Sequence, residues 1–189
     1  MDVRGACALY YQYEIWRKGK RIKRSRKRLS RSFLTAYITC LYLRMVATSN
    51  FSLTDTGGSS RSVGFFNRMI TIAAAADATI GLVAGTGTNA VTITDSKLQT
   101  QITHGVTSGK LDHGASVVNL PSSDSTSTSL ILTRVFANSS GGAITVTEIG
   151  VYINESTSGF KFCLIRDLAT IALSNGDQLT LNYILKTTV

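Results

Sequence analysis

Short runs of alternating apolar and polar residues, separated by glycine- and asparagine-rich turns, recur through most of this chain of 189 residues. In the clearest run, residues 179–186, Leu179, Leu181, Tyr183 and Leu185 alternate with mostly polar residues. A period of two is typical of a β-strand with one buried face. The pattern predicts strands over residues 65–74, 79–84, 116–120, 129–137, 144–153, 160–166 and 179–186.

The segments between these runs carry turn chemistry. We expect residues 138–142 (NSSGG) to form a hairpin loop, and residues 175–177 (NGD) and 155–159 to make turns, each ahead of the strand that follows it. Residues 95–102 are the one helix-like stretch, with Thr94 or Asp95 as its N-cap. Many short strands at this spacing predict an all-β fold, an antiparallel β-sandwich or jelly roll.

Positive charge divides the chain into two parts. Residues 1–44 hold 12 Lys and Arg against two acidic residues, whereas residues 45–189 hold 8 against 9. We therefore expect a basic N-terminal extension over residues 1–44, helical or disordered, a flexible entry segment over residues 45–62 and a β-sandwich domain over residues 63–189. On this division, residues 45–189 fold and associate without the extension.

The extension has two other interpretations. Residues 33–43 (FLTAYITCLYL) are apolar and follow the basic run, as in an export signal, but they are too short to span a bilayer, so we expect no transmembrane segment. Alternatively, Met45 rather than Met1 is the native start, and the preceding residues are under no folding constraint.

Ten cations fall within fifteen residues of the extension. Such a run neutralises phosphates and releases their counterions, which predicts sequence-independent, salt-sensitive binding of nucleic acid. Trp16 and Tyr13 border the run and are candidates to stack on bases. The alternative is a solvated arm with no partner. The candidate nucleic-acid-binding residues are Arg17, Lys18, Lys20, Arg21, Lys23, Arg24, Arg26, Lys27, Arg28 and Arg31.

Elsewhere the sequence predicts no catalytic, cofactor-binding or metal site, and we expect no enzymatic activity. The Gly85-Thr-Gly87 segment lacks the lysine of a phosphate-binding loop. His104 and His113 read as surface-loop residues, although His113 beside Asp112 raises the alternative of a metal or acid–base pair. Cys163, in an apolar run, is predicted to be a small core residue.

Four segments together resemble a recurring pattern of tailed-bacteriophage virion proteins. Residues 83–104 (VAGTGTNAVTITDSKLQTQITH) match a G-T-G-T-x-A-x-x-x-x-D-x-x-L segment, and residues 130–153 contain strands of the types TRxFxN and ITVxEIGxY. Residues 164–167 (LIRD) and 175–184 (NGDQLTLNYI) follow as in that group. The resemblance covers most of residues 80–189 and none of residues 1–44.

The resemblance implies a non-enzymatic structural component of a phage or prophage virion, from the tail, neck, fibre or capsid surface. The protein would assemble in the host cytoplasm, associate with itself as a homo-oligomer and dock on other virion proteins, with packaged nucleic acid as a further partner of the basic arm. A carbohydrate-binding β-sandwich is the remaining alternative. It requires exposed aromatic side chains, for which Tyr152, Tyr183 and a few phenylalanines are available.

Overall fold

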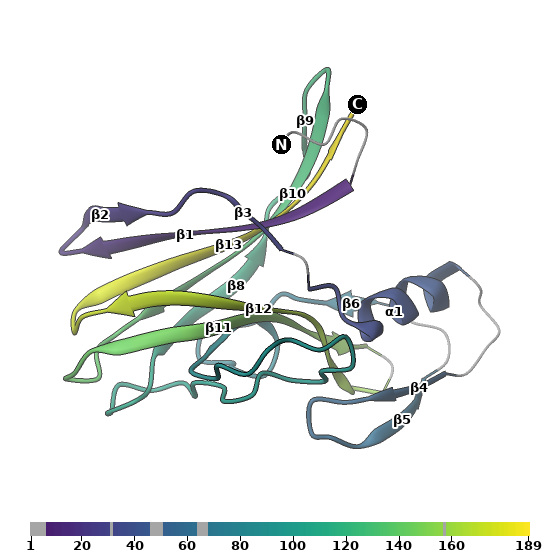
Figure 1. Cartoon of the computed structure of the whole chain (residues 1–189), viewed down its shortest axis with the longest axis horizontal. Helices are drawn as coiled ribbons and strands as arrows, with labels where there is room; N and C mark the ends of the chain where they lie inside the picture. The colour runs from purple at the N-terminus through teal and green to yellow at the C-terminus, as the bar shows by residue number, and fades with distance from the viewer. Residues whose placement is uncertain (1–6, 31, 46–50, 64–67, 157) are drawn as a thin grey trace.

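The computed structural model describes residues 7–30, 32–45, 51–63, 68–156 and 158–189, and it is a sandwich of two antiparallel sheets (Figure 1). The predicted all-β, sandwich-like fold is thus confirmed. The first sheet has the order β2-β1-β13-β10-β8, with β3 paired to β1 and β9 paired to β10. Its strands are β1 (Cys7–Arg17), β2 (Lys20–Arg24), β3 (Arg28–Leu29), β8 (Asp112–Val118), β9 (Ser122–Ser123), β10 (Ser127–Ala137) and β13 (Asp177–Thr188).

The second sheet is built on one long hairpin, β11 (Ile144–Glu155) with β12 (Lys161–Leu173). Two short strands, β6 (Met69–Ile70) and β7 (Gly81–Gly85), pair with the other side of β11. A separate hairpin of β4 (Phe51–Thr54) and β5 (Ser60–Val63) and the helix α1 (Thr35–Met45) lie beside this sheet (Figure 1). Among the described residues, no helix is long and apolar enough to cross a membrane.

Alternating side chains of both sheets meet in one core. Leu179, Leu181 and Tyr183 of β13 are almost fully buried, as are Ile149 and Ile171 of the second sheet. The apolar residues that alternate over residues 179–186 therefore form the inner face of β13, a central strand of the first sheet. The predicted strands at 129–137, 144–153, 160–166 and 179–186 correspond to β10, β11, β12 and β13, which are all somewhat longer.

The remaining strand predictions were less accurate. Residues 79–84 and 116–120 correspond to β7 and to the end of β8, whereas residues 65–74 contain only β6 and one isolated bridge at Ala73, with residues 65–67 outside the described part. The entry segment was expected to be flexible, but residues 51–63 form the β4–β5 hairpin. An ion pair of 2.6 Å between Arg61 and Asp55 stabilises its turn.

The expectation that residues 1–44 form a helical or disordered extension is wrong for most of the described part of this segment. The strand β1 pairs with β13 along its whole length, from Cys7 opposite Thr187 to Arg17 opposite Asp177. Its inward side chains Leu9, Tyr11, Tyr13 and Ile15 are each at most 5% exposed, so β1 is core and not appendage. The change in charge near residue 44 predicted a domain boundary, but β1 packs with the rest of the protein in one core. Within residues 33–43, the apolar stretch belongs to the amphipathic helix α1, which buries Ala36, Cys40 and Leu43.

Residues 138–142 do not close a hairpin, because β10 and β11 belong to different sheets. This loop and the predicted turn at residues 175–177 both cross from one sheet to the other and bind each other. The amide of Gly176 donates to the Asn138 carbonyl at 2.7 Å, and the amide of Asn138 donates to the Asp177 carbonyl at 2.8 Å. The predicted turn at residues 155–159 is present ahead of β12 and joins the β11–β12 hairpin.

The predicted helix at residues 95–102 is also wrong, because this segment is an irregular loop. Asp95 accepts hydrogen bonds from Thr92 behind it, and the amide of Ile102 donates to the Ala84 carbonyl at 2.9 Å. The loop therefore lies along β7, and its amides are bound by side chains of the second sheet that are distant in sequence.

Candidate functional site

The basic run forms a hairpin at one edge of the first sheet. Lys18 and Gly19 are the two residues of its turn, with φ of 49° and 73°. Positive φ at both positions fits the tight turn that matches the twist of paired strands, and glycine adopts it without strain. The strand β2 lies at the edge of the first sheet (Figure 1). All five of its residues are exposed, and four of them are Lys or Arg. We call residues 17–24 the basic hairpin.

Three of its arginines are held by carboxylates of the protein itself. Arg17 makes a bidentate ion pair with the buried Asp177, at 2.6 and 3.0 Å. The hydrogen bond from Arg17 holds the pKa of Asp177 below its ordinary value. Arg21 and Arg24 both contact Glu14, at 3.2 and 3.1 Å. These arginines therefore contribute little unpaired charge.

Six other candidate cations are exposed and form no ion pair with any carboxylate of the described residues; they are Lys18, Lys20, Lys23, Arg26, Lys27 and Arg28. Arg31 lies outside the described residues. Lys23 Nζ lies 5.7 Å from the ring centre of Tyr13. Tyr13 itself is 3% exposed and cannot stack on a base, so the prediction that it does is wrong. Trp16 is half-buried, and the guanidinium carbon Cζ of Arg21 lies 5.9 Å from the centre of its ring, so part of the Trp16 ring is still accessible to a base.

A second cluster of charged groups lies between the second sheet and the segment that follows β7, with two of its members buried and one half-buried. Glu148 of β11 is fully buried, and its carboxylate accepts the backbone N–H groups of Gly87, Gln99 and Thr100 at 2.7–3.0 Å. Arg166 of β12 donates to Glu148 at 2.9 Å and to Asp95 at 2.7 Å. It also donates to the Asn89 carbonyl at 3.1 Å. We call Asp95, Glu148 and Arg166 the Glu148 network.

The Glu148 network explains the glycines of the G-T-G segment. A Cβ added at Gly85 or Gly87 would lie 2.6 or 2.5 Å from Glu148 Oε1, closer than real Cβ contacts. Both glycines are thus required so that the backbone can approach this carboxylate. The anion bound by the segment is the protein's own Glu148. The network fixes residues 86–104, the 86–104 loop, onto the sheet.

His113 is not a surface-loop residue, because it lies in β8 and is 1% exposed. Its ring packs edge-on against Phe136, and neither ring nitrogen has a hydrogen-bond partner among the described residues. Burial, with smaller contributions from the charges of Arg134 and His104, lowers the pKa of His113 to about 4. The side chain of Asp112 lies 3.5 Å from His104 and not beside His113. Among the described residues, no cluster of three or more His, Cys, Asp or Glu could hold a metal ion.

Two further predictions concern the core. Cys163 is fully buried, as expected, and burial raises the pKa of its thiol. Tyr152 and Tyr183 are each 2% exposed, so neither offers the aromatic platform that the carbohydrate hypothesis required. Phe136 and Phe162 are fully buried as well.

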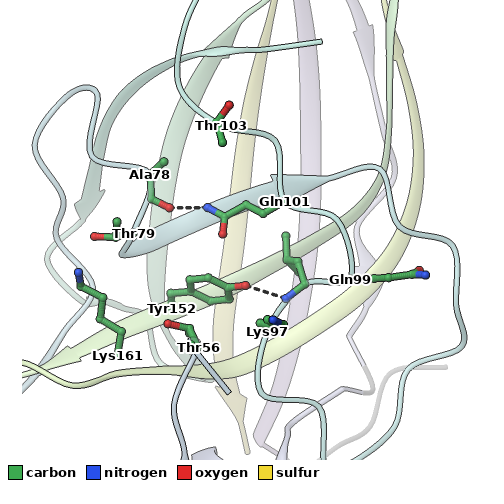
Figure 2. A pocket seen from close by; sticks show the side chains of 11 residues that line it. Thr56, Ala78, Thr79, Lys97, Gln99, Gln101, Thr103, Tyr152 and Lys161 are labelled. Atoms are coloured by element: carbon green, nitrogen blue, oxygen red, sulfur yellow. Dashed lines mark hydrogen bonds between the residues drawn. The ribbon is translucent and has the colours of Figure 1, made fainter. Parts of the chain in front are cut away.

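One pocket of about 530 Å³ opens beside the 86–104 loop, where this loop, the start of β12 and the β4–β5 turn meet (Figure 2). Lys161 and Thr79 lie on one side of it and Lys97 and Gln99 on the other, with Tyr152 between them. This pocket was not predicted from the sequence, because its residues come from five separate segments.

No protein-family model, curated protein or solved structure matches this chain. Its function must therefore be inferred from the residues and their geometry.

Proposed function

We propose that this chain is a non-enzymatic structural protein of a tailed-phage or prophage virion, which associates with itself and docks on other virion proteins. The main support for the proposal is that residues from separate segments of the resemblance meet in the Glu148 network. Gly85, Gly87, Asp95, Glu148 and Arg166 come from three parts of the pattern and converge in one buried network. Its effect is to fix an outward-facing loop, which suits a protein that presents a rigid surface to neighbours.

The free sheet edge is unsuited to strand pairing between copies. β2 carries Lys20, Arg21, Lys23 and Arg24, and charged side chains on an edge oppose pairing with another strand. The edge strand β8 is covered instead by the segment around Ala73, which exchanges two backbone hydrogen bonds with Ser116. We therefore assign association between copies to side-chain contacts rather than to strand pairing at these two edges.

Exposed apolar side chains gather on the outer side of α1 and at the start of β4. They are Ile38, Leu41, Tyr42, Met45 and Phe51, with exposures between 39% and 77%, and we call them the α1 patch. The rings of Tyr42 and Phe51 contact each other, with centroids 5.1 Å apart, so the patch continues from helix to strand. A group of this kind is typical of a protein–protein contact. We assign it to a second copy of this chain.

Analytical ultracentrifugation of the full chain tests this assignment. We expect a concentration-dependent oligomer, which Ile38→Glu shifts to monomer because a charge then enters the contact. Ile72→Glu is the matched control, since Ile72 and Ile38 are both 59% exposed and only Ile38 belongs to the α1 patch. A parent chain that stays monomeric at all concentrations, or equal effects of both variants, would contradict the assignment.

A second function, contact with nucleic acid, is favoured by the six exposed and unpaired cations on and after the basic hairpin. Each phosphate contact adds about 0.9 to the slope of log K against log salt for duplex DNA. Fluorescence anisotropy with a duplex of mixed sequence should therefore show a slope about 2 lower for the double variant Lys20→Gln/Lys23→Gln. Arg68→Gln/Lys110→Gln removes the same charge at exposed positions elsewhere. An unchanged slope for the hairpin variant, or an equal loss in the control, would eliminate this function.

A further inference from the structure

The pocket of Figure 2 combines two cations with neutral polar groups. Lys97 and Lys161 line it together with glutamine and threonine side chains, and none of its described lining residues carries a carboxylate. Its volume of about 530 Å³ lies within the range of about 300–1,000 Å³ that is typical of small-molecule sites.

Hydrogen bonds to the surrounding backbone fix the orientation of both glutamines. Gln99 Oε1 accepts the amides of Thr88 and Asn89, each at 2.9 Å, which leaves its Nε2 to donate. Gln101 Nε2 donates to the Ala78 carbonyl, which leaves its Oε1 to accept (Figure 2). The Gln99 side chain is directed away from the pocket, toward residues 88 and 89, so the amide group presented to the pocket is the Gln101 Oε1 acceptor (Figure 2).

Tyr152 adds a second oriented group, a donor beside the Gln101 acceptor, and a hydroxyl group requires such a pair. Its hydroxyl oxygen accepts the Leu98 amide at 2.6 Å, and no described residue accepts its proton (Figure 2). Burial is the main cause that raises the pKa of this phenol, so the proton stays on the oxygen at neutral pH. A buried donor without an acceptor in the protein is a group that a ligand can satisfy.

One carboxylate lies near the pocket without lining it. Burial alone would raise the pKa of Asp77, but hydrogen bonds from Thr79 and the charges of Lys161 and Arg134 hold it below its ordinary value. Asp77 is therefore anionic and offsets part of the charge of Lys161. Lys97 has no ion pair with a described residue. The remaining charge favours a ligand that is itself anionic.

We propose that this pocket binds a small anion that carries several hydroxyl groups, of the size of one sugar unit. Lys97, which forms no ion pair with a described residue, faces its charged group, Lys161 adds positive charge from the opposite side, and Gln101 and Tyr152 face its hydroxyls. Recognition by cations and amides needs no exposed aromatic ring, which the protein does not supply here. The proposal is independent of the assembly role, and either can fail while the other holds.

Isothermal titration calorimetry on the full chain tests the site with glucuronate, glucose 6-phosphate and glucose. We expect saturable binding of at least one of the two anions, at least about tenfold tighter than binding of neutral glucose. A preference for glucuronate or for glucose 6-phosphate would identify the charged group as a carboxylate or a phosphate. No saturable binding of either anion, or equal binding of glucose, would overturn the proposal.

Two lysine variants locate the site. The double variant Lys97→Met/Lys161→Met keeps the aliphatic stems and should weaken binding of the anion by about tenfold or more. Lys110→Met removes an exposed lysine that does not line the pocket, and it should bind as the parent does. Circular dichroism confirms that each variant is folded. Equal losses in the double variant and the control would show non-specific attraction and reject the site.

Discussion

Glu148 is the single side chain on which the 86–104 loop depends most. It is a fully buried carboxylate that accepts three backbone amides and one arginine. None of these partners is near it in sequence, which is why residues 95–102 resemble a helix when only their local sequence is considered. The local pattern favoured a helix, and the non-local carboxylate decided the outcome.

Glu148→Gln should therefore destabilise the protein far more than its change of one atom indicates. The amide nitrogen would face N–H donors, and the buried Arg166 would lose one of its two carboxylates. Breaking a buried ion pair costs about 3–5 kcal/mol. Urea denaturation measures the loss. Glu14→Gln removes a carboxylate that also has two arginine partners but lies at the surface, and it should cost at most about 1 kcal/mol. Similar losses in the two variants would refute the structural role of Glu148.

His113 predicts a dependence of stability on pH. Its ordinary pKa is 6.5 and burial lowers it to about 4, so the unfolded chain binds the proton more readily than the folded one. The contribution of neutral His113 to the free energy of unfolding is therefore fully present above pH 6.5. It is lost as the pH drops from 6.5 to 4, by about 3 kcal/mol in total.

His113→Leu removes this titration and leaves that of the carboxylates. The free energy of unfolding should fall less steeply for the variant than for the parent between pH 6.5 and 4. Denaturation at several pH values measures both slopes. Parallel curves for parent and variant would show that His113 does not titrate in this way.

At the scale of elements, local alternation was sufficient for β10, β11, β12 and β13 and insufficient for β1. The alternation of Leu9, Tyr11, Tyr13 and Ile15 is present, and Lys18-Gly19 marks the turn after it. Both signals were outweighed by a run of ten cations, half of which lie in the turn and in the exposed strand β2. The cations indicate that β2 is exposed to solvent, but they do not determine whether the neighbouring strand β1 is buried.

Deletion of residues 1–44 should thus do more than remove a basic arm. It would uncover the edge of β13 along eleven paired positions and expose the core faces of Leu179, Leu181 and Tyr183. We expect the fragment 45–189 to be insoluble or to lack a cooperative transition by circular dichroism. Lys20→Gln/Lys23→Gln, which changes only the exposed edge, should keep the parent's transition. A soluble fragment with a cooperative transition would show that β1 is dispensable.

At the scale of the whole molecule, hydrogen bonds through the core join the two sheets. Asp167 of the second sheet accepts hydrogen bonds from Tyr183 of the first, at 2.8 Å, and from Ser30, at 2.7 Å. The buried Arg134 of β10 donates to carbonyls of Ile80 and Leu82, at 3.1 and 2.9 Å. These links, together with the two crossing loops, give neither sheet an independent core.

The division of charge in the sequence predicts that residues 1–44 unfold separately from the rest, whereas these hydrogen bonds predict that the whole chain unfolds as one unit. Trp16 is the only tryptophan and lies in β1, so its fluorescence reports on the basic N-terminal segment, while far-UV circular dichroism reports on both sheets. In urea, the two signals should change with one midpoint and one slope, because β1 cannot separate without opening the shared core. If the fluorescence changed at a lower urea concentration than the circular dichroism, β1 would detach first, and residues 1–44 would be the separate unit that their charge indicates.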